Sequence, residues 1–474
     1  MLTKPQELPA AAEEEEIPSA VFDLPRRSEL RLSVPRGEAF YSASVTLVRQ
    51  EGDRHVECLG APLASDVRYW LSPGESFSIW SWTTAKLMFT GSERFLRSIY
   101  RPAQGDDTRA MAAAELHSLL HIDRLKAKSR GAIGPCVLVV GSRGVGKHSV
   151  ARTLLNYAAR LGWCPTFVDL DPSASQRVAV PGAIGATIVE HPTAIDDTLL
   201  GSGVSLHFFV GSLSAQRVDL TYHSQRSIDP AFRHASKQLL KVTQERLHTH
   251  SAAPSGASGC VVVCPELCGM DGVRMLHEWI HESLPSASNV VSIGDDFLFH
   301  HLSRLLRTNA AAPERFDGRT HTTLHGTKLH LDRLSPSKGV RCAVSASAQA
   351  RQRNFCYERY LHHHGAQGFV VNPLLHVRRH QDLDAYVVEC QDDRPTAAAV
   401  ERVRLPSLRG LLGAIVDAKG LSGGSSILEA NVIAYCRLDD VDGDEVHLRT
   451  TVNDLPRGNK SIRVLFGSVV WGVE

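Results

Sequence analysis

The chain has 474 residues, and its 52 basic and 51 acidic side chains leave a formal net charge of +1. This balance indicates neither a nucleic-acid partner nor its absence, because any basic surface must then be local. We expect an intracellular protein of about three domains without a membrane span. No apolar run reaches membrane-spanning length, the acidic N-terminus has no signal-peptide core, and ten cysteines are scattered without a disulfide framework.

The first 130 residues predict a tail, a β domain and a helical linker. Residues 1–20 hold proline, alanine and a run of four glutamates, a composition typical of disorder. Residues 21–105 alternate apolar and polar side chains in short runs separated by Gly, Pro and Asp, which predicts a small β-sandwich. Residues 106–130 lack strand texture, show helical spacing and end in a basic stretch, which predicts a helical linker.

The remaining residues predict a central α/β domain and a second β domain. Residues 131–367 alternate strands and helices, with predicted strands at 135–140, 166–170, 259–263 and 290–294. Within them, residues 307–335 are rich in Thr, His, Ala and Gly, and we expect an insertion or a mobile loop there, which is also a candidate partner surface. Residues 368–474 return to β texture and predict a compact, mainly-β end domain.

The most specific motif is a glycine-rich run that begins at Gly141. A phosphate-binding loop needs glycine, four residues, glycine, lysine and then serine or threonine. Gly141, Gly146 and Lys147 meet this spacing, but His148 stands where the hydroxyl is required. The sequence therefore separates nucleotide binding, which the backbone and Lys147 can provide, from phosphoryl transfer, which needs a metal.

The surroundings of this run support the phosphate-loop interpretation. An apolar strand precedes it, an amphipathic helix follows it, and the next strand ends in the acidic pair Asp169 and Asp171. Strand, glycine-rich turn and helix aim backbone N–H groups and a helix N-terminus at phosphates. The alternative is an ordinary tight turn, in which Lys147 is an odd choice at the positive end of a helix dipole. The predicted fold class is α/β, a phosphate-loop NTPase-type parallel sheet flanked by an N-terminal β-sandwich and a C-terminal mainly-β domain.

The histidine at position 148 puts the metal in question. Mg²⁺ demands oxygen ligands, whereas imidazole suits zinc, copper or iron. Ser149 is not a direct substitute, because one residue along a helix rotates a side chain by about 100°. A water could connect Ser149 or Asp171 to Mg²⁺, since this ion keeps several waters.

Two other clusters are better explained by packing than by metal binding. Cys260 and Cys264 flank an apolar strand, and no histidine is spaced with them and Cys268 as a zinc site requires. The run His362-His363-His364 reads as a solvated or packed turn.

Several segments together resemble the Clp-one family, which comprises polyribonucleotide 5′-hydroxyl kinases and subunits of the mRNA cleavage and polyadenylation factor. The similarity runs from about residue 20 to the end and includes the segments GPCVLVVGSRGVGKHSV, LLNYAARLGWCPTFVDLDP and VPGAIGATIVEHP. Of these, LLNYAARLG with PTFVDLD is specific to the family. The resemblance implies three domains, ATP with Mg²⁺ as cofactors, and nuclear action in pre-mRNA 3′-end processing. It implies partners among the other subunits of that machinery, including a polymerase II-associated cleavage factor subunit, and RNA as a further partner for kinase members.

The family's site residues can be placed on this sequence. The resemblance implies a nucleotide site built from Glu29, which approaches the adenine, Ser76, Gly141, Gly144, Val145, Gly146, Lys147, His148 and Ser149. It also implies that Asp171 is the general base of the kinase reaction. Ser149 and Asp171 remain the candidates to hold Mg²⁺, through a bridging water. The lid arginines fall on Arg351 and Arg353, without the family's spacing.

Four positions depart from the kinase pattern. His148 replaces the hydroxyl, Ser76 replaces a lysine near the base, Leu267 replaces the tryptophan that clasps the RNA base, and Gln176 is out of register after Asp171. The favoured hypothesis is therefore an ATP-binding scaffold subunit without kinase activity. The alternatives are an active RNA 5′-kinase, with Lys147 and Asp171 catalytic, and an unrelated phosphate-loop NTPase switch.

Overall fold

The computed structural model describes residues 17–471, with gaps. The gaps are 36–37, 39–41, 50–54, 104–107, 174–177, 196–204, 220–224, 309–319, 324, 337–349, 351–352, 355, 358–359, 361–372, 392–393, 418–426 and 452–461. The chain divides into two compact units, one made of Met1–Glu57 and Pro62–Arg101 and one made of Cys58–Ala61 and Pro102–Glu474. In the described ranges, no helix is long and apolar enough to cross a membrane.

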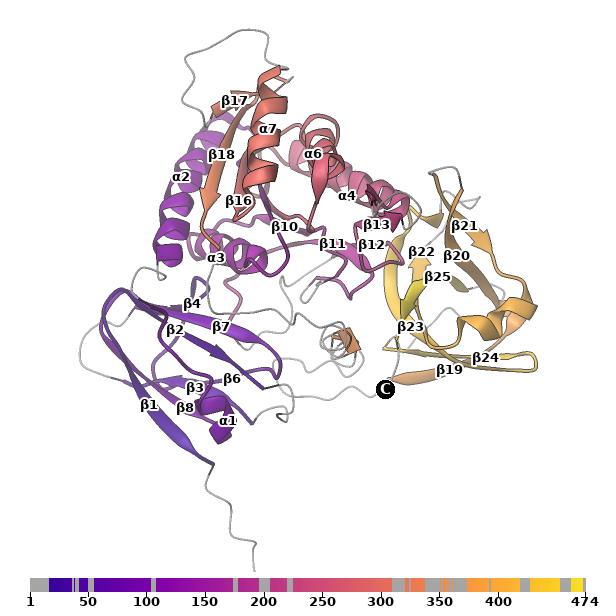
Figure 1. The fold of residues 1–474 in the computed structure, drawn as a ribbon, viewed down its shortest axis with the longest axis horizontal. Helices are drawn as coiled ribbons and strands as arrows, with labels where there is room; N and C mark the ends of the chain where they lie inside the picture. Colours follow the sequence, from indigo (N-terminus) through magenta and orange to yellow (C-terminus); the bar gives the residue numbers. More distant parts are fainter. Residues whose placement is uncertain are drawn as a thin grey trace, which may run out of the picture. The chain divides into compact units, whose positions relative to one another are not determined.

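The first unit is the predicted β-sandwich, formed by two four-stranded sheets (Figure 1). One sheet has the order β1-β8-β3-β6 and the other the order β2-β7-β4-β5. Apolar side chains of both sheets, among them Leu30, Ile79 and Phe89, are fully buried between them. The strands are β1 Ser19–Leu24, β2 Ser28–Ser33, β3 Ser44–Leu47, β4 Val56–Cys58, β5 Ala61–Pro62, β6 Arg68–Trp70, β7 Ser76–Ser81 and β8 Ala85–Thr90, and the short helix α1 is Glu93–Leu96. β1 starts inside the segment that the composition assigned to the tail.

The second unit contains the predicted central sheet, with eight strands in the order β12-β11-β10-β15-β9-β16-β18-β17. The five strands from β10 to β18 run parallel, and β11, β12 and β17 are antiparallel to their neighbours. The strands are β9 Cys136–Gly141, β10 Thr166–Asp169, β11 Ala183–Ile188, β12 Leu206–Phe209, β15 Cys260–Val263, β16 Ala287–Ile293, β17 Thr320–Thr322 and β18 Lys328–Leu334. The carboxyl ends of β9, β10, β15, β16 and β18 therefore meet at one edge, where open α/β sheets bind ligands.

Helices cover both faces of this sheet (Figure 1). Val137, Val139 and Val261 point to one face and pack against α2 (Thr108–Arg130) and α3 (Lys147–Arg160). Leu138 and Val262 point to the opposite face, where helices from later in the chain lie. These helices are α4 Pro230–Thr249, α6 Gly269–Glu278 with its π-helical extension Trp279–Ser283, and α7 Asp296–Thr308; the short α5 is Pro254–Ala257. Burial on both faces explains the continuous apolar strands in the sequence.

Within residues 307–335, the expectation of an insertion or mobile loop is wrong for 320–322 and 328–334, whereas 309–319 and 324 lie outside the described residues. The segment contains β17 and β18, and β18 pairs in parallel with β16 inside the central sheet. Leu329 and Leu331 alternate with polar residues and are 0% and 1% exposed. The segment KLHLDRL does alternate polar and apolar residues as a strand does, but the Thr and His residues around it are typical of a loop.

The second unit ends in the predicted mainly-β domain, a seven-stranded sheet of order β19-β24-β23-β22-β25-β20-β21. Its strands are β19 Leu374–Arg379, β20 Leu383–Gln391, β21 Arg394–Ala399, β22 Leu411–Asp417, β23 Asn431–Asp442, β24 Glu445–Thr450 and β25 Ile462–Val470. Its buried face shares one apolar cluster with the central domain, which includes Ala183 and Phe209 of the central domain and Leu412 and Val469 of the β domain.

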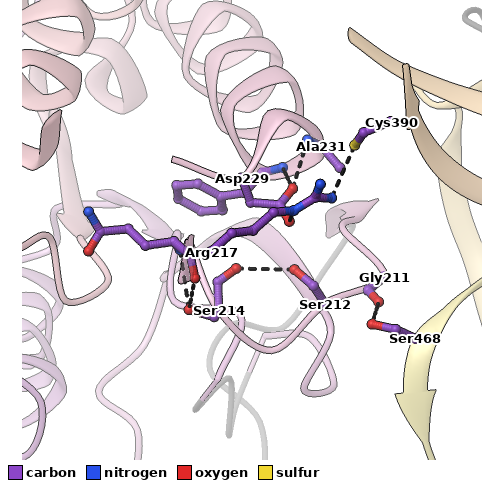
Figure 2. A network of polar contacts seen from close by, with 10 residues as sticks. Gly211, Ser212, Ser214, Arg217, Asp229, Ala231, Cys390 and Ser468 are labelled. Carbon is purple, nitrogen blue, oxygen red and sulfur yellow. Dashed lines mark hydrogen bonds and ion pairs between the residues drawn. The ribbon is translucent and has the colours of Figure 1, made fainter. Parts of the chain in front are cut away.

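Polar contacts also cross this junction (Figure 2). Arg217, on the hairpin of β13 (Gln216–Asp219) and β14 (Gln225–Ile228), donates through Nε to Asp229 Oδ2 at 2.6 Å and through Nη2 to Cys390 Sγ at 3.1 Å. Asp229 also caps α4, accepting from the Ala231 amide at 2.8 Å. Nearby, the Ser468 amide donates to the Gly211 carbonyl at 2.8 Å. The two domains of this unit are therefore joined by apolar burial and directed hydrogen bonds.

Buried histidines of the second unit should make it sensitive to acid. Burial lowers the pKa of His117, His207 and His281 to about 4, from an unfolded value of about 6.5. Between these values the unfolded chain binds protons that the folded chain does not, so stability is lost as the pH falls from about 6.5 to about 4. We expect the free energy of unfolding, measured with urea between pH 7.5 and 4.5, to fall. His207→Gln should reduce this dependence of stability on pH by up to about 1.4 kcal/mol per pH unit. An unchanged slope in His207→Gln would contradict this assignment.

Candidate nucleotide-binding site

The phosphate-loop motif forms the turn between β9 and α3 at the ligand-binding edge of the sheet. Gly141, Gly144 and Gly146 have φ values of +146°, +79° and +92°, which favour glycine. A Cβ on Gly141 would lie 2.4 Å from the Ile293 carbonyl oxygen of β16. Gly146 is the N-cap of α3. The predicted strand, turn and helix are therefore all present, with the helix N-terminus at the loop.

Lys147 is turned toward the loop itself. Lys147 is the first residue of α3 and is 4% exposed. Its Nζ donates to the carbonyls of Gly141 at 2.8 Å and Ser142 at 3.0 Å. These carbonyls offset the unfavourable position of a cation at a helix N-terminus. The ammonium is thus held by the backbone of the loop.

His148 pairs with an acid from another strand. Its Nε2 lies 3.0 Å from Oδ2 of Asp169, at the end of β10, and the Asp169 side chain is 2% exposed. Burial opposes protonation of the ring, but the charge and hydrogen bond of Asp169 and the charge of Asp171 outweigh it, so the pKa of His148 is raised. Asp169 Oδ1 accepts from the Asp171 amide at 3.1 Å. Both carboxylate oxygens of Asp169 are therefore engaged within the protein.

These residues do not fit an Mg²⁺ ion in the usual phosphate-loop position. The hydroxyl ligand is replaced by an imidazole, and the neighbouring acid, Asp169, is bonded to that imidazole. Asp171 is 6% exposed, and its Oδ1 accepts from both the amide and the hydroxyl of Ser173, at 3.0 and 2.7 Å. In the part of the chain that the structure describes, no group of three His, Cys, Asp or Glu side chains could hold a metal.

The position that would clasp an RNA base is buried. Leu267 follows β15, is 4% exposed and belongs to the apolar core of the central domain. The loop after it is fixed by the Gln216 amide group, which donates to the Cys268 carbonyl and accepts from the Cys268 amide, both at 2.9 Å. Leu267 is therefore a core residue rather than a stacking platform.

The remaining predicted site residues lie outside the phosphate loop in the sequence. Glu29, on β2 of the first unit, is 6% exposed and binds Arg31 through two hydrogen bonds of 2.9 Å. Ser76 begins β7 and donates to the Ser33 hydroxyl at 3.1 Å. Arg353 is helical, whereas Arg351 and Gln176 lie outside the described residues, as does the histidine run 362–364. The roles of all these residues stay predictions.

Sequence reasoning missed two residues that hold the helix after the loop. Asn156, within the quoted LLNYAARLG segment, is fully buried in α3. Its Nδ2 donates to the Leu59 carbonyl at 2.8 Å, and its Oδ1 accepts from the Thr193 amide at 2.9 Å. Arg152 donates to the carbonyls of Thr193 and Ala194 at 3.1 and 2.5 Å. The available signal in the sequence was the presence of polar residues among the apolar residues of α3.

Comparison with known families identifies the same regions. The family model for the phosphate-loop domain of the mRNA cleavage and polyadenylation factor CLP1 matches residues 141–363. The model for the N-terminal β-sandwich domain of polyadenylation factor matches residues 23–127. The first of these matches starts at Gly141, the first residue of the phosphate loop.

Individual relatives are distant. The chain is 26% identical to the polyribonucleotide 5′-hydroxyl-kinase Clp1 of Bos taurus over 294 residues, which is 62% of each chain. It has the same identity and coverage with the Homo sapiens protein of that name, and is 33% identical to the Danio rerio protein over 176 residues, 37% of each chain. The matched part thus spans less than two thirds of these relatives.

Solved structures match over nearly the whole length. A structure of Clp1p with Pcf11p, which addresses ATP loss in a glycine-to-arginine mutant, has a TM-score of 0.73 at 18% identity. It covers 96% of this chain and 99% of the other. At this identity the match establishes the three-part fold alone. The two family models and these relatives show that the chain belongs to the Clp1 family of mRNA cleavage and polyadenylation factor subunits, as a divergent member.

Proposed function

We propose that this protein is a nucleotide-binding scaffold subunit of the pre-mRNA 3′-end cleavage and polyadenylation machinery that does not transfer phosphate. The observation that carries the proposal is the 3.0 Å contact between His148 Nε2 and Asp169 Oδ2. This pair fills the place of the metal-binding hydroxyl, while the glycine backbone and Lys147 are retained. ATP is the nucleotide expected from the family. Its binding stabilises the folded chain as any tight ligand does.

Loss of transfer follows from the number of positioning groups that are changed. Phosphoryl transfer depends on positioning and on a metal that neutralises developing charge. Removing one preorganised electrostatic contact costs about 10²–10³ in rate. A base stacked on an aromatic side chain gains about 1–3 kcal/mol, which the buried Leu267 does not provide. These losses affect both substrates of the reaction.

An active polyribonucleotide 5′-kinase is the second candidate function. Lys147 is retained, and Asp171 lies at the carboxyl end of β10 with one oxygen uncommitted by its bonds to Ser173. In this case Asp171 is the general base, and Asp171→Asn should abolish transfer. The scaffold proposal is preferred because this candidate requires Mg²⁺, which the site does not fit.

The proposed partners and location follow the relatives. The solved relatives are complexes of Clp1p with Pcf11p. We propose that this chain likewise binds a polymerase II-associated cleavage factor subunit and acts in the nucleus. Co-purification of cleavage-factor subunits supports this proposal, whereas recovery of tRNA-splicing endonuclease subunits instead would contradict it.

A transfer assay tests the catalytic part of the proposal. Purified full-length protein is incubated with γ-labelled ATP, Mg²⁺ and a 5′-hydroxyl RNA, beside the Lys147→Ala variant. We expect no transfer above that variant, together with thermal protection of the wild-type chain by ATP. Transfer that depends on Lys147 and Asp171 would establish the kinase instead.

ATP binding is expected to depend little on Mg²⁺. The side chains of His148 and Asp169 are hydrogen-bonded to each other, so the ion has no oxygen ligand at its usual place. The dissociation constant of ATP, measured by calorimetry in Mg²⁺ and in EDTA, should agree within about threefold, or roughly 0.65 kcal/mol. His148→Ser should restore metal dependence without restoring transfer, because Leu267 remains buried. A loss of affinity greater than tenfold for the wild-type chain in EDTA would refute this prediction.

A further inference from the structure

Arg109 contacts the phosphate loop, although 36 positions of chain separate it from Val145. It is the second residue of α2, and its Nη1 donates to the Val145 carbonyl of the loop at 2.9 Å. A Cβ built on Gly146 would lie 2.4 Å from the same Nη1. The missing side chain at Gly146 is therefore what admits the guanidinium to the backbone of the loop.

The same side chain reaches a second part of the binding edge. Arg109 Nη2 donates to the Ser335 carbonyl at 2.6 Å. Ser335 directly follows β18, whose last residue, Leu334, accepts a hydrogen bond from the Gly294 amide after β16 at 3.2 Å. One planar guanidinium thus connects α2, the phosphate loop after β9 and the chain leaving β18. Arginine suits such a place because its donors form a rigid fork that stays charged.

The contact with Val145 fixes the direction of a group that binds phosphate. The peptide bond between Val145 and Gly146 is trans, as are all peptide bonds of the described chain. In a planar trans peptide the carbonyl and the following N–H point in opposite directions. Holding the Val145 carbonyl on one side therefore directs the Gly146 N–H to the other. Backbone N–H groups of such a loop are the donors that hold phosphates.

We infer that Arg109 is a positioning residue of the nucleotide site, which orients the Gly146 amide and couples the phosphate-binding state of the loop to α2 and to the end of β18. This inference rests on the proposed nucleotide binding. It assigns Arg109 no direct contact with the nucleotide. Its effect should therefore be confined to ligands that carry phosphates, because it acts through the backbone donor.

The test compares phosphorylated and unphosphorylated ligands. Binding of ATP, pyrophosphate and adenosine to the full-length chain is measured by calorimetry for the wild type, Arg109→Met and Arg109→Lys. Arg130→Met, at the exposed other end of α2, is the matched control. We expect Arg109→Met to lower the affinity for ATP and for pyrophosphate by about tenfold or more, which is the typical effect of losing a charge-assisted hydrogen bond. Adenosine should change less than twofold, and Arg109→Lys should be intermediate because an ammonium lacks the fork.

The outcomes separate this inference from the proposed function. If the wild-type chain binds no ATP, the proposed function itself fails. Two results with a wild-type chain that binds ATP would show that the role assigned to Arg109 is wrong. One is an ATP affinity of Arg109→Met within twofold of the wild type, and the other is an equal loss of affinity for ATP and for adenosine. Tighter ATP binding by Arg109→Met would also overturn the inference, because the guanidinium would then obstruct the loop. Should Arg109→Met fail to fold, Arg109→Lys decides the question by the same split between ATP and adenosine.

Discussion

Replacing Lys147 by alanine is expected to weaken ATP binding by about 100-fold and to remove most of the thermal protection that ATP gives. The Lys147 ammonium is buried and held by the carbonyls of Gly141 and Ser142, so a bound phosphate would replace these neutral acceptors with an anionic one. Each hydrogen bond to a charged group contributes about 1.5–3 kcal/mol. If ATP is present at about 100 times its dissociation constant, protection should fall from about 2.7 to about 0.4 kcal/mol.

Calorimetry and thermal unfolding with and without ATP measure this effect. Lys241→Ala, which removes an exposed lysine from α4, is the control and should bind ATP like the wild type. If Lys147→Ala retained ATP affinity within threefold, nucleotide binding at this loop would be refuted.

A second large effect is expected at the junction between the central and C-terminal domains. A Cβ on Gly467 would lie 2.2 Å from the Cα and 2.3 Å from the carbonyl oxygen of Gly211. Both are backbone atoms, so the overlap is relieved only by separating β25 from the turn after β12. Gly467→Ala should therefore lower the free energy of unfolding by about 3 kcal/mol or more, at or above the usual cost of overpacking.

Chemical denaturation of the full chain measures this loss. Ser468→Ala is the matched control at the adjacent position, because it removes a hydroxyl 3.2 Å from the Gly211 carbonyl but keeps the amide bond to it. It should cost about 1 kcal/mol or less. A Gly467→Ala chain within 0.5 kcal/mol of the wild type would mean that the domains separate there at little cost, contrary to typical overpacking.

The comparison of His148 and Lys147 shows how much of the site follows from sequence. The spacing of Gly141, Gly146 and Lys147 predicted a strand, turn and helix, and the structure confirms that arrangement. The same spacing identified His148 as unusual for Mg²⁺. It did not identify its partner, because β10 and β9 are separated by β15 in the sheet, and only the sheet order brings Asp169 to the ring.

The wrong prediction of a loop where β18 forms has a different cause. Periodicity predicts a strand when its apolar positions alternate with polar ones over a clear window. In residues 328–334 the alternation is short, and the Thr- and His-rich residues before it are typical of loops. Pairing with β16 decides the conformation, because the sheet buries Leu329 and Leu331 and satisfies the backbone.

Three features of this protein can be predicted from its sequence: the three-part fold, the phosphate loop and the membership in the Clp1 family. Each of these depends on short-range patterns, namely the period of apolar residues, the spacing of glycines and a few contiguous segments. The side chains that meet at the loop, in contrast, follow from tertiary packing. His148 meets Asp169, and Arg109 meets Val145 and Ser335, the latter across 226 positions of chain. Such contacts depend on the order of strands and on the packing of α2, and no local pattern encodes either.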